Sequence, residues 1–491
     1  MNKSFFFFTA FLVLSQWLPA QPPQPRSVEF IMRDPRWMGT SPDNVFWSED
    51  GKSVYFDWRR EGDKGDSLYV VSASGGTPRR VTLAERKKMP ARFGDYSRDW
   101  KKKVYTRDGD IFVLDLRRNT ETQLTRSVIP ESNPRFTGDE KKIVFERDGN
   151  LFLRVLETGL ESQVTNFTRG TRPQEERKTD LQKYLTQESL KLSEVLEERK
   201  DERERRQKYQ EALAEKRPKP YYLGSKNTST VVLSPDERFV SFVLSQQAGE
   251  AKRAIVPSFV TESGFTEDIN ARSKVGEPLT TFEYYVYNVG LDSVMVVKPD
   301  AVPGVVPARG ESDTSKAKPK ARGVLYNGPS WSDDGKNGFV QLFSQDNKDR
   351  WIVLLDPEKA QFTTVLDRQT DTAWVGGPGI GFFGGNTVGW MPDSKRIFFQ
   401  SETDGWSHLY TVSLDGKTRN QLTKGPFEVY NPFLSRDKRR WYLTSNEVHF
   451  GERHFYTMPL EGGTRVRVTT LEGRNDVMTS PEENRLAVLH S

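Results

Sequence analysis

A short phrase recurs along this chain and limits what the chain can fold into. Each copy has an aromatic or apolar residue, a small residue, a variable residue, an acidic residue, a turn residue and a basic residue, followed by a β-rich run. The clearest copies start at Trp47 and Trp331. Weaker copies start at Tyr96, Phe136, Leu233, Trp390, Leu434 and Thr479. Starts roughly 40 to 50 residues apart, with four short strands per unit, are typical of a β-propeller.

Hairpin signals divide each repeat into strands. Asp108-Gly109 and Asp148-Gly149 separate alternating apolar runs, and such turns need positive φ. Several units end on an apolar residue and a threonine, as at Leu422-Thr423. A single unit has an uncovered face that a neighbouring unit must cover. The sequence therefore predicts an all-β chain, a β-propeller of seven or eight blades over residues 21–491 whose last blade is incomplete.

Two stretches interrupt the repeats. Residues from about 171 to 220 have apolar residues at helical spacing and then an almost wholly charged run, which predicts a long charged helical insertion. It is either an arm that contacts a partner or shades an entrance, or a solvated helix held by i,i+4 ion pairs, and we favour the second interpretation. Residues from about 299 to 322 are rich in Pro, Lys, Ala and Ser, which predicts a flexible surface loop.

The first residues are typical of an export signal. A basic Lys3, an apolar run from Phe5 to Leu14 and a small residue at Ala20 predict a signal peptide over residues 1–20, with an uncleaved anchor as the alternative. No later segment is long and apolar enough to predict a membrane span. We therefore expect an exported protein, either periplasmic or secreted.

The composition excludes several kinds of site. There is no cysteine, which removes disulfides, thiolate metal sites and cysteine nucleophiles. The four histidines are not spaced as ligands, so we expect no metal and no cofactor. The 73 basic and 68 acidic residues nearly balance, so no nucleic-acid partner is expected. No Gly-x-Ser-x-Gly motif occurs, and we assign no catalytic residue to this chain.

One segment, from Val260 to Arg272, interrupts a repeat without strand alternation. Long loops on rigid scaffolds often carry function. The carboxylates of Glu262 and Glu267 could hold a peptide's ammonium group, and Arg272 could hold a carbonyl or a carboxylate. These three residues are the candidate substrate-binding set. The alternative is that they pair with one another.

The run from Ser401 to Tyr410 is followed by Gln421–Gly425 and then by Glu428-Val429. From the residues alone it is a hairpin that turns at Asp404-Gly405. Together with the repeats, it resembles the N-terminal propeller of dipeptidyl peptidase IV-like enzymes, which belong to the prolyl oligopeptidase family of serine peptidases. The resemblance covers about residues 40 to 491.

The resemblance implies a parent protein that is an exported serine peptidase acting on short peptides. In that family the propeller restricts access to an α/β-hydrolase domain that follows it. Because this chain stops at Ser491, we expect a fragment or truncated product that is inactive alone. Its expected partners are a peptide substrate and that C-terminal domain, and the parent could be a homodimer.

The family holds the substrate's amino terminus with two adjacent glutamates in a propeller insertion. The pairs Glu175-Glu176 and Glu197-Glu198 lack the family's flanking residues, which argues against dipeptide release. The alternative function is a non-enzymatic exported propeller that binds a protein or glycan partner.

Overall fold

The computed structural model describes residues 27–32, 40–60, 63–173, 179–191, 193–249, 252–307, 320–381 and 386–491. The predicted signal peptide, the pair Glu175-Glu176 and the middle of the predicted flexible loop lie outside these ranges. Within the described ranges the chain is mostly β, as predicted, with helices confined to short additions. No helix in this part of the chain is both long and apolar enough to cross a membrane.

Seven four-stranded antiparallel sheets form most of the described chain, and a two-stranded sheet follows them. The first three sheets contain β1 (Asp43–Trp47), β2 (Ser53–Trp58), β3 (Ser67–Ser72) and β4 (Arg79–Arg80); β5 (Asp95–Tyr96), β6 (Lys102–Arg107), β7 (Asp110–Asp115) and β8 (Thr120–Gln123); and β9 (Glu131–Phe136), β10 (Lys142–Arg147), β11 (Asn150–Val155) and β12 (Glu161–Gln163). The fourth and fifth contain β15 (Asn227–Leu233), β16 (Phe239–Gln246), β19 (Thr281–Asn288) and β20 (Ser293–Val297); and β21 (Val324–Trp331), β22 (Gly338–Ser344), β23 (Asp349–Asp356) and β24 (Gln361–Thr370). The sixth, seventh and last contain β25 (Val388–Trp390), β26 (Arg396–Ser401), β27 (His408–Ser413) and β28 (Arg419–Gln421); β29 (Val429–Leu434), β30 (Arg440–Ser445), β31 (His454–Pro459) and β32 (Val466–Arg467); and β33 (Asn475–Thr479) with β34 (Leu486–His490).

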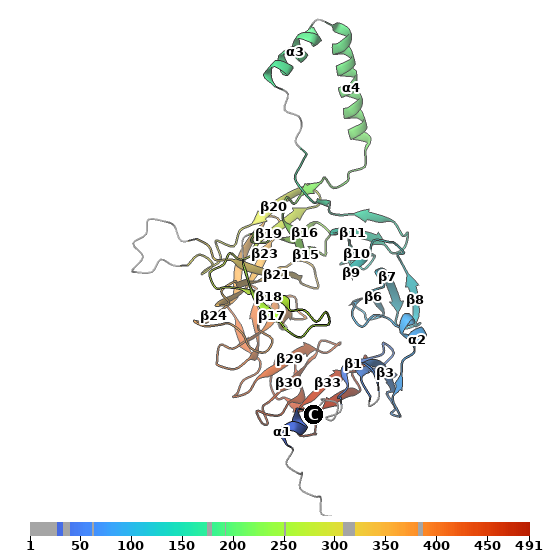
Figure 1. Ribbon diagram of the computed structural model, residues 1–491, viewed down its shortest axis with the longest axis vertical. Helices are drawn as coiled ribbons and strands as arrows, with labels where there is room; N and C mark the ends of the chain where they lie inside the picture. Colours follow the sequence, from blue (N-terminus) through green and yellow to red (C-terminus); the bar gives the residue numbers. More distant parts are fainter. Residues whose placement is uncertain are drawn as a thin grey trace, which may run out of the picture.

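The sheets follow one another around a common centre, with strands such as β9, β15, β21 and β29 nearest to it (Figure 1). The last sheet lies beside the first, because Trp47 Nε1 donates a hydrogen bond to the carbonyl of Met478 at 2.9 Å. Ala487 and Leu489 of β34 pack against the buried Val45 and Tyr69 of the first sheet. The two ends of the described β structure are thus in contact.

The recurring phrase forms the turn between the first and second strands of a sheet. Ser48 Oγ donates to Asp50 Oδ1 at 2.6 Å and accepts from the Ser53 amide at 3.0 Å. Ser332 makes the same two bonds, to Asp334 at 2.6 Å and from the Asn337 amide at 3.1 Å. Short hydroxyl and carboxylate side chains bond local backbone groups in this way, which explains the Ser-x-Asp spacing.

The terminal threonines of the repeats extend the strand ladders. Their Oγ1 atoms accept a backbone amide hydrogen bond from the third strand of the same sheet, at 2.8 to 3.0 Å. The pairs of amide donor and acceptor are Ile111 and Thr125, Leu151 and Thr165, Leu409 and Thr423, and Phe455 and Thr469. A side chain thereby satisfies a buried amide where the fourth strand has ended.

The short helices are α1 (Val28–Ile31) and α2 (Leu83–Lys88), and the longer α3 (Asp180–Lys191) and α4 (Glu194–Leu213) lie in the predicted helical insertion. The pair α3–α4 projects away from the sheets (Figure 1). A parallel pair of short strands, β13 (Phe167–Thr168) and β14 (Tyr221–Tyr222), joins the insertion to the sheets. No side chain of α4 is buried, which agrees with the interpretation of α4 as a solvated helix.

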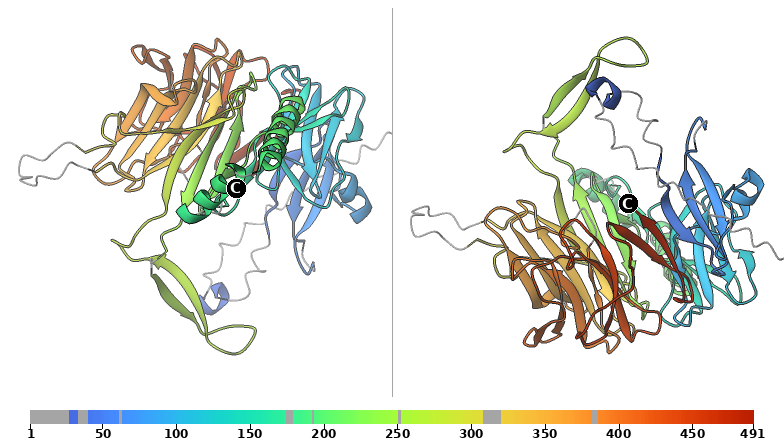
Figure 2. Two further views of the ribbon diagram at one scale, coloured as in Figure 1. Left: turned by 90° about the horizontal axis from the view of Figure 1, so that it is seen from above. Right: turned by 90° about the horizontal axis from the view of Figure 1, so that it is seen from below.

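A second insertion is a hairpin of β17 (Arg253–Ser258) and β18 (Glu267–Ser273), placed between β16 and β19. It projects from one face of the molecule (Figure 2). The described ends of the predicted flexible loop are anchored, because Val302 and Val305 are buried in the core beside Trp351. Arg322, at the other end of that loop, forms an ion pair with Asp349 at 2.6 Å.

Candidate functional site

The three predicted substrate-binding residues lie on the projecting hairpin. Glu262 is in the turn between β17 and β18, whereas Glu267 and Arg272 are near opposite ends of β18, and all three are exposed. Glu267 accepts a hydrogen bond from Ser263 Oγ at 2.7 Å. No ion pair joins the three within the described chain.

Only one of the two glutamate pairs considered for the amino-terminal role lies within the described residues. Glu197 and Glu198 lie on the exposed surface of α4. Glu175 and Glu176 lie outside the described residues.

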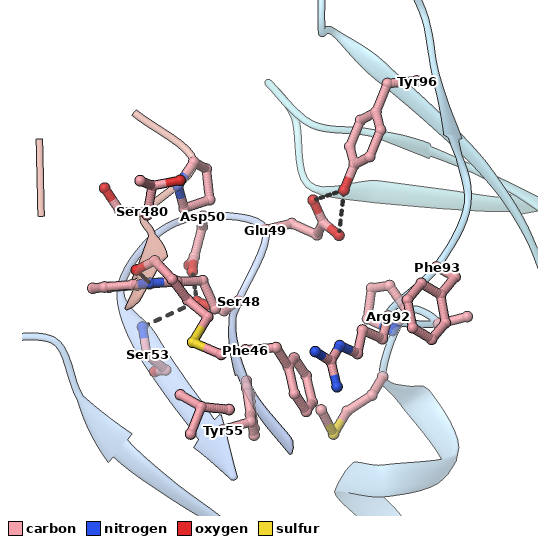
Figure 3. Close-up of a pocket in the computed structure, with 18 of the residues that line it drawn as sticks. Phe46, Ser48, Glu49, Asp50, Ser53, Tyr55, Arg92, Phe93, Tyr96 and Ser480 are labelled. Carbon is pink, nitrogen blue, oxygen red and sulfur yellow. Dashed lines mark hydrogen bonds between the residues drawn. The ribbon is translucent and has the colours of Figure 1, made fainter. Parts of the chain in front are cut away.

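A cleft of about 490 Å³ lies where the first, second and last sheets meet (Figure 3). Phe46 and Glu49 come from β1 and the turn after it, Arg92 comes from the segment between α2 and β5, Tyr96 ends β5, and Ser480 comes from the turn after β33. The guanidinium carbon of Arg92 is 5.4 Å from the ring centre of Phe46. The cleft therefore offers a cation and aromatic faces.

A buried lysine that does not line this cleft bonds three residues that do. Lys103 Nζ donates to Glu49 Oε1 at 2.6 Å and to the carbonyls of Ala91 and Arg92 at 2.7 and 3.1 Å, so all three ammonium hydrogens are used. The Tyr96 hydroxyl donates to both Glu49 oxygens, at 3.0 and 3.1 Å. Burial, together with the adjacent Glu49 carboxylate, raises the pKa of Tyr96 far above its ordinary value. The network is saturated and ties the first sheet to the second.

Two histidines have structural positions. His408, at the start of β27, is fully buried between Thr423 Oγ1 at 3.0 Å and the carbonyl of Gly425 at 2.9 Å. His454 starts β31 in the same way, with Thr469 Oγ1 at 3.3 Å and Glu452 Oε2 at 2.7 Å. Neither has a serine hydroxyl as a partner. The hairpin interpretation of Ser401–Tyr410 agrees with this, because β26 pairs with β27 through Ser401 and His408.

A second cavity, of about 520 Å³, lies near the centre of the molecule. Arg135 of β9, Thr230 of β15, Trp331 of β21 and Gln341 of β22 line it. Asn386, just before β25, completes its wall. The cavity is therefore bounded by four consecutive sheets.

Turns of three distant sheets meet at one end of this centre. Arg98 Nη2 donates to the carbonyl of Asp333 at 2.9 Å, and the ammonium group of Lys438 forms an ion pair with the Asp333 carboxylate. The guanidinium of Arg436 lies over the ring of Trp100, 4.3 Å from its centre. We call these five residues the turn cluster. It joins the second, fifth and seventh sheets across the centre.

The innermost strands carry a repeated bulge that the sequence interpretation missed. The register shifts where one residue has positive φ: Asn44, Asn133, Thr230, Gly328 and Asn431. In three strands a proline follows directly, at Pro134, Pro329 and Pro432. Proline is tolerated on a strand whose outer edge is unpaired, and Asn or Gly tolerates positive φ. The recurring Asn-Pro or Gly-Pro pair was the signal that could have located the central cavity.

The described chain is mostly β, and its sheets surround a lined centre. Residues 214–491 match the family model described as the dipeptidyl peptidase IV (DPP IV) N-terminal region. This match covers more than half of the chain, so the chain belongs to that family.

Among curated proteins, the chain is similar to dipeptidyl peptidase 4 of Trichophyton rubrum, with 21% identity over 237 residues, covering 46% of this chain and 27% of that protein. For dipeptidyl peptidase 4 of Trichophyton equinum the identity is 20% over 236 residues, with the same coverage of 46% and 27%. The match thus spans about a quarter of the length of these relatives.

A solved structure shares the fold. The crystal structure of Porphyromonas gingivalis dipeptidyl peptidase 4 aligns with a TM-score of 0.52 and 15% identity, covering 92% of this chain and 57% of that chain. The likeness therefore extends over nearly all of this chain, including the residues before 214.

Proposed function

We propose that this chain is the substrate-gating β-propeller of an exported serine peptidase that acts on short peptides. The observation that carries the proposal is the family match over residues 214–491. The eight successive sheets around one centre support an eight-bladed propeller whose last blade has two strands in this chain.

Gating is supported by the turn cluster. Its contacts cross the centre between sheets that are far apart in the sequence, such as that of Lys438 with Asp333. A folded protein could not pass between turns that touch, whereas a short peptide could reach the centre from the other end.

The chemistry would belong to another part of the parent protein. Acyl transfer needs a nucleophile, a general base and donors for the oxyanion, held together. We propose that an α/β-hydrolase domain of the parent supplies them, that this chain alone hydrolyses nothing, and that the parent can form a homodimer. The first twenty residues would be removed on export, so the mature chain would begin near Gln21. Mass spectrometry of the exported protein tests that cleavage.

The decisive experiment compares this chain with the product of the gene extended downstream. Both are treated with an active-site serine probe and assayed on proline-containing chromogenic dipeptides. We expect labelling and hydrolysis from the extended product alone. Labelling of the 491-residue chain would contradict the scaffold role, and an unlabelled extended product would contradict the peptidase.

The projecting hairpin favours a second candidate function, a propeller that binds a protein partner. Phe259, Val260 and Phe265 are 77%, 93% and 78% exposed at its tip, and such apolar exposure marks interaction sites. Glu262, Glu267 and Arg272 would then contact substrate or partner individually from this hairpin. Alanine at these three positions should weaken peptide turnover by the extended product if they hold substrate. Unchanged turnover would mean that the three residues do not hold substrate and would favour a role in binding a protein partner.

A further inference from the structure

The central cavity carries an unusual set of polar groups. Trp331 Nε1, Gln341 Oε1 and both side-chain heteroatoms of Asn386 are buried without a hydrogen-bond partner. All four atoms belong to residues that line this one cavity. Gln341 is only 3% exposed. An unpartnered buried polar atom costs about 1–3 kcal/mol, so a cluster of them indicates groups that are satisfied by something else.

Comparison with equivalent tryptophans shows that Trp331 is the exception. Trp47, Trp331 and Trp390 end the first strands of three sheets. Trp47 Nε1 donates to Met478 O at 2.9 Å, and Trp390 Nε1 donates to Ser330 O at 3.2 Å, so each bonds the first strand of the neighbouring sheet. Trp331 makes no such bond and lines the cavity instead.

The cavity also has an exposed cationic side chain among its described lining residues. Arg135 is its single cationic lining residue, and it is exposed. It forms no ion pair with any carboxylate of the described chain, although it interacts electrostatically with Asp95 on its other side. Apolar groups of Val232, Phe339 and Val388 form the rest of the wall. A volume of about 520 Å³ suits a small ligand with polar groups along its length.

These donors and acceptors match a peptide main chain, which they would reach once the lining side chains turn toward the cavity, since the atoms are buried as they stand. The Asn386 carboxamide can donate to the C=O and accept from the N–H of a peptide, Trp331 can donate to a carbonyl, and Gln341 Oε1 can accept from an amide. A guanidinium binds a carboxylate by charge-assisted hydrogen bonds. We propose that the central cavity is a subsite for the carboxyl-terminal part of a short extended peptide, with Arg135 on its terminal carboxylate.

The inference rests on the proposed peptidase function, but its test does not need hydrolysis. Saturation-transfer NMR is recorded on the intact chain with tetra-alanine and with its C-terminal amide, which lacks the carboxylate. We expect tetra-alanine to bind, and the amide to bind roughly tenfold more weakly because a charge-assisted bond is lost. Absence of tetra-alanine binding, or equal binding of the amide, would overturn the assignment of Arg135 and the subsite.

Variants locate the bound peptide. Gln341→Leu and Asn386→Asp should each abolish the saturation-transfer signal of tetra-alanine. Gln341→Leu should also keep or raise the melting temperature, because it removes an unpartnered buried oxygen. Thr411→Val is the matched control, because Thr411 Oγ1 is also buried without a partner but does not line the cavity. It should bind tetra-alanine as the wild type does.

Two outcomes separate this inference from the proposed function. Wild-type binding by both cavity variants would overturn the subsite even if the extended product labels with the serine probe. Loss of binding in both variants, with an unlabelled extended product, would retain the subsite and reject the peptidase.

Discussion

At the residue scale, the repeated tryptophans show how one position serves two purposes. Trp47 and Trp390 each link their sheet to its neighbour by an indole hydrogen bond, whereas the Trp331 indole N–H has no partner in the described part of the chain. The same residue type thus joins neighbouring sheets at two positions and lines the central cavity at the third.

This difference predicts that replacing tryptophan by phenylalanine lowers the free energy of unfolding by different amounts at the three positions. Trp47→Phe and Trp390→Phe should each lower the free energy of unfolding by about 1 kcal/mol more than Trp331→Phe, because only the first two lose a hydrogen bond. The loss of ring area is common to all three variants and cancels. Denaturant unfolding measures the loss of unfolding free energy in each variant. Equal losses would show that the inter-sheet hydrogen bonds add nothing to stability.

Lys103 gives a second prediction at this scale. Lys103→Met should cost about 3 kcal/mol, because Glu49 and two carbonyls would lose their buried partner. Lys101→Met is the control, since its ion pair with Asp99 is solvent-exposed and should contribute little to the free energy of unfolding. Denaturant unfolding of the two variants checks this prediction. Similar losses of unfolding free energy would mean that water hydrates the Glu49 carboxylate once Lys103 is removed.

At the element scale, the threonines that end the repeats hold the third strands. Thr423 Oγ1 accepts from the Leu409 amide at 2.9 Å and lies 3.0 Å from His408 Nδ1. Thr411, two residues further along the same strand as Leu409, has a buried hydroxyl with no partner. The two threonines have the same shape but different bonding.

Replacement by the isosteric valine should therefore separate them. Thr423→Val should destabilise by about 1–3 kcal/mol, because a buried amide and an imidazole lose their partner. Thr411→Val should leave the stability unchanged or raise it, because it removes a buried hydroxyl that has no partner to lose. Thermal unfolding of the two variants tests this prediction. An unchanged stability of Thr423→Val would show that water replaces the lost hydroxyl.

The helical insertion is a separable element. Tyr221 of β14 packs on Phe167 and Phe242, with ring centres 6.3 and 6.0 Å apart, so the base belongs to the core. Replacing residues 173–216 by a Gly-Ser bridge should leave the cooperative melting transition unchanged, because α3 and α4 lie beyond that base. A longer deletion that includes Tyr221 and Tyr222 should lower the melting temperature. Loss of the transition in the shorter deletion would show that the helices pack into the core.

At the scale of the whole molecule, the turn cluster couples sheets that are distant in sequence. Asp333 contacts Arg98 of the second sheet and Lys438 of the seventh. Both partners of the Lys438 ion pair are about half exposed, so its strength should be modest and sensitive to salt.

Lys438→Met should therefore raise amide hydrogen exchange in the turns at 97–102 and 332–337 by a few-fold at low salt, an effect of roughly 1 kcal/mol or less. Lys336→Met is the control, because Lys336 shares the turn with Asp333 but forms no ion pair in the described chain. Exchange that rises only near residue 438 would show that the turns move independently.

The sequence by itself determined the repeat, the strand class and the interrupting segments. These follow from local rules: Ser-x-Asp bonds its own turn, Asp-Gly favours positive φ, and charged residues at helical spacing form a solvated helix. Tertiary structure decided which polar residues share a cavity. Arg135, Gln341 and Asn386 come from three sheets and have no common local pattern, so only the arrangement of sheets around the centre brings them together. Likewise, Glu262, Glu267 and Arg272 are close in sequence, but only the fold shows that Glu262 lies in the turn of an exposed hairpin while Glu267 and Arg272 lie near opposite ends of β18.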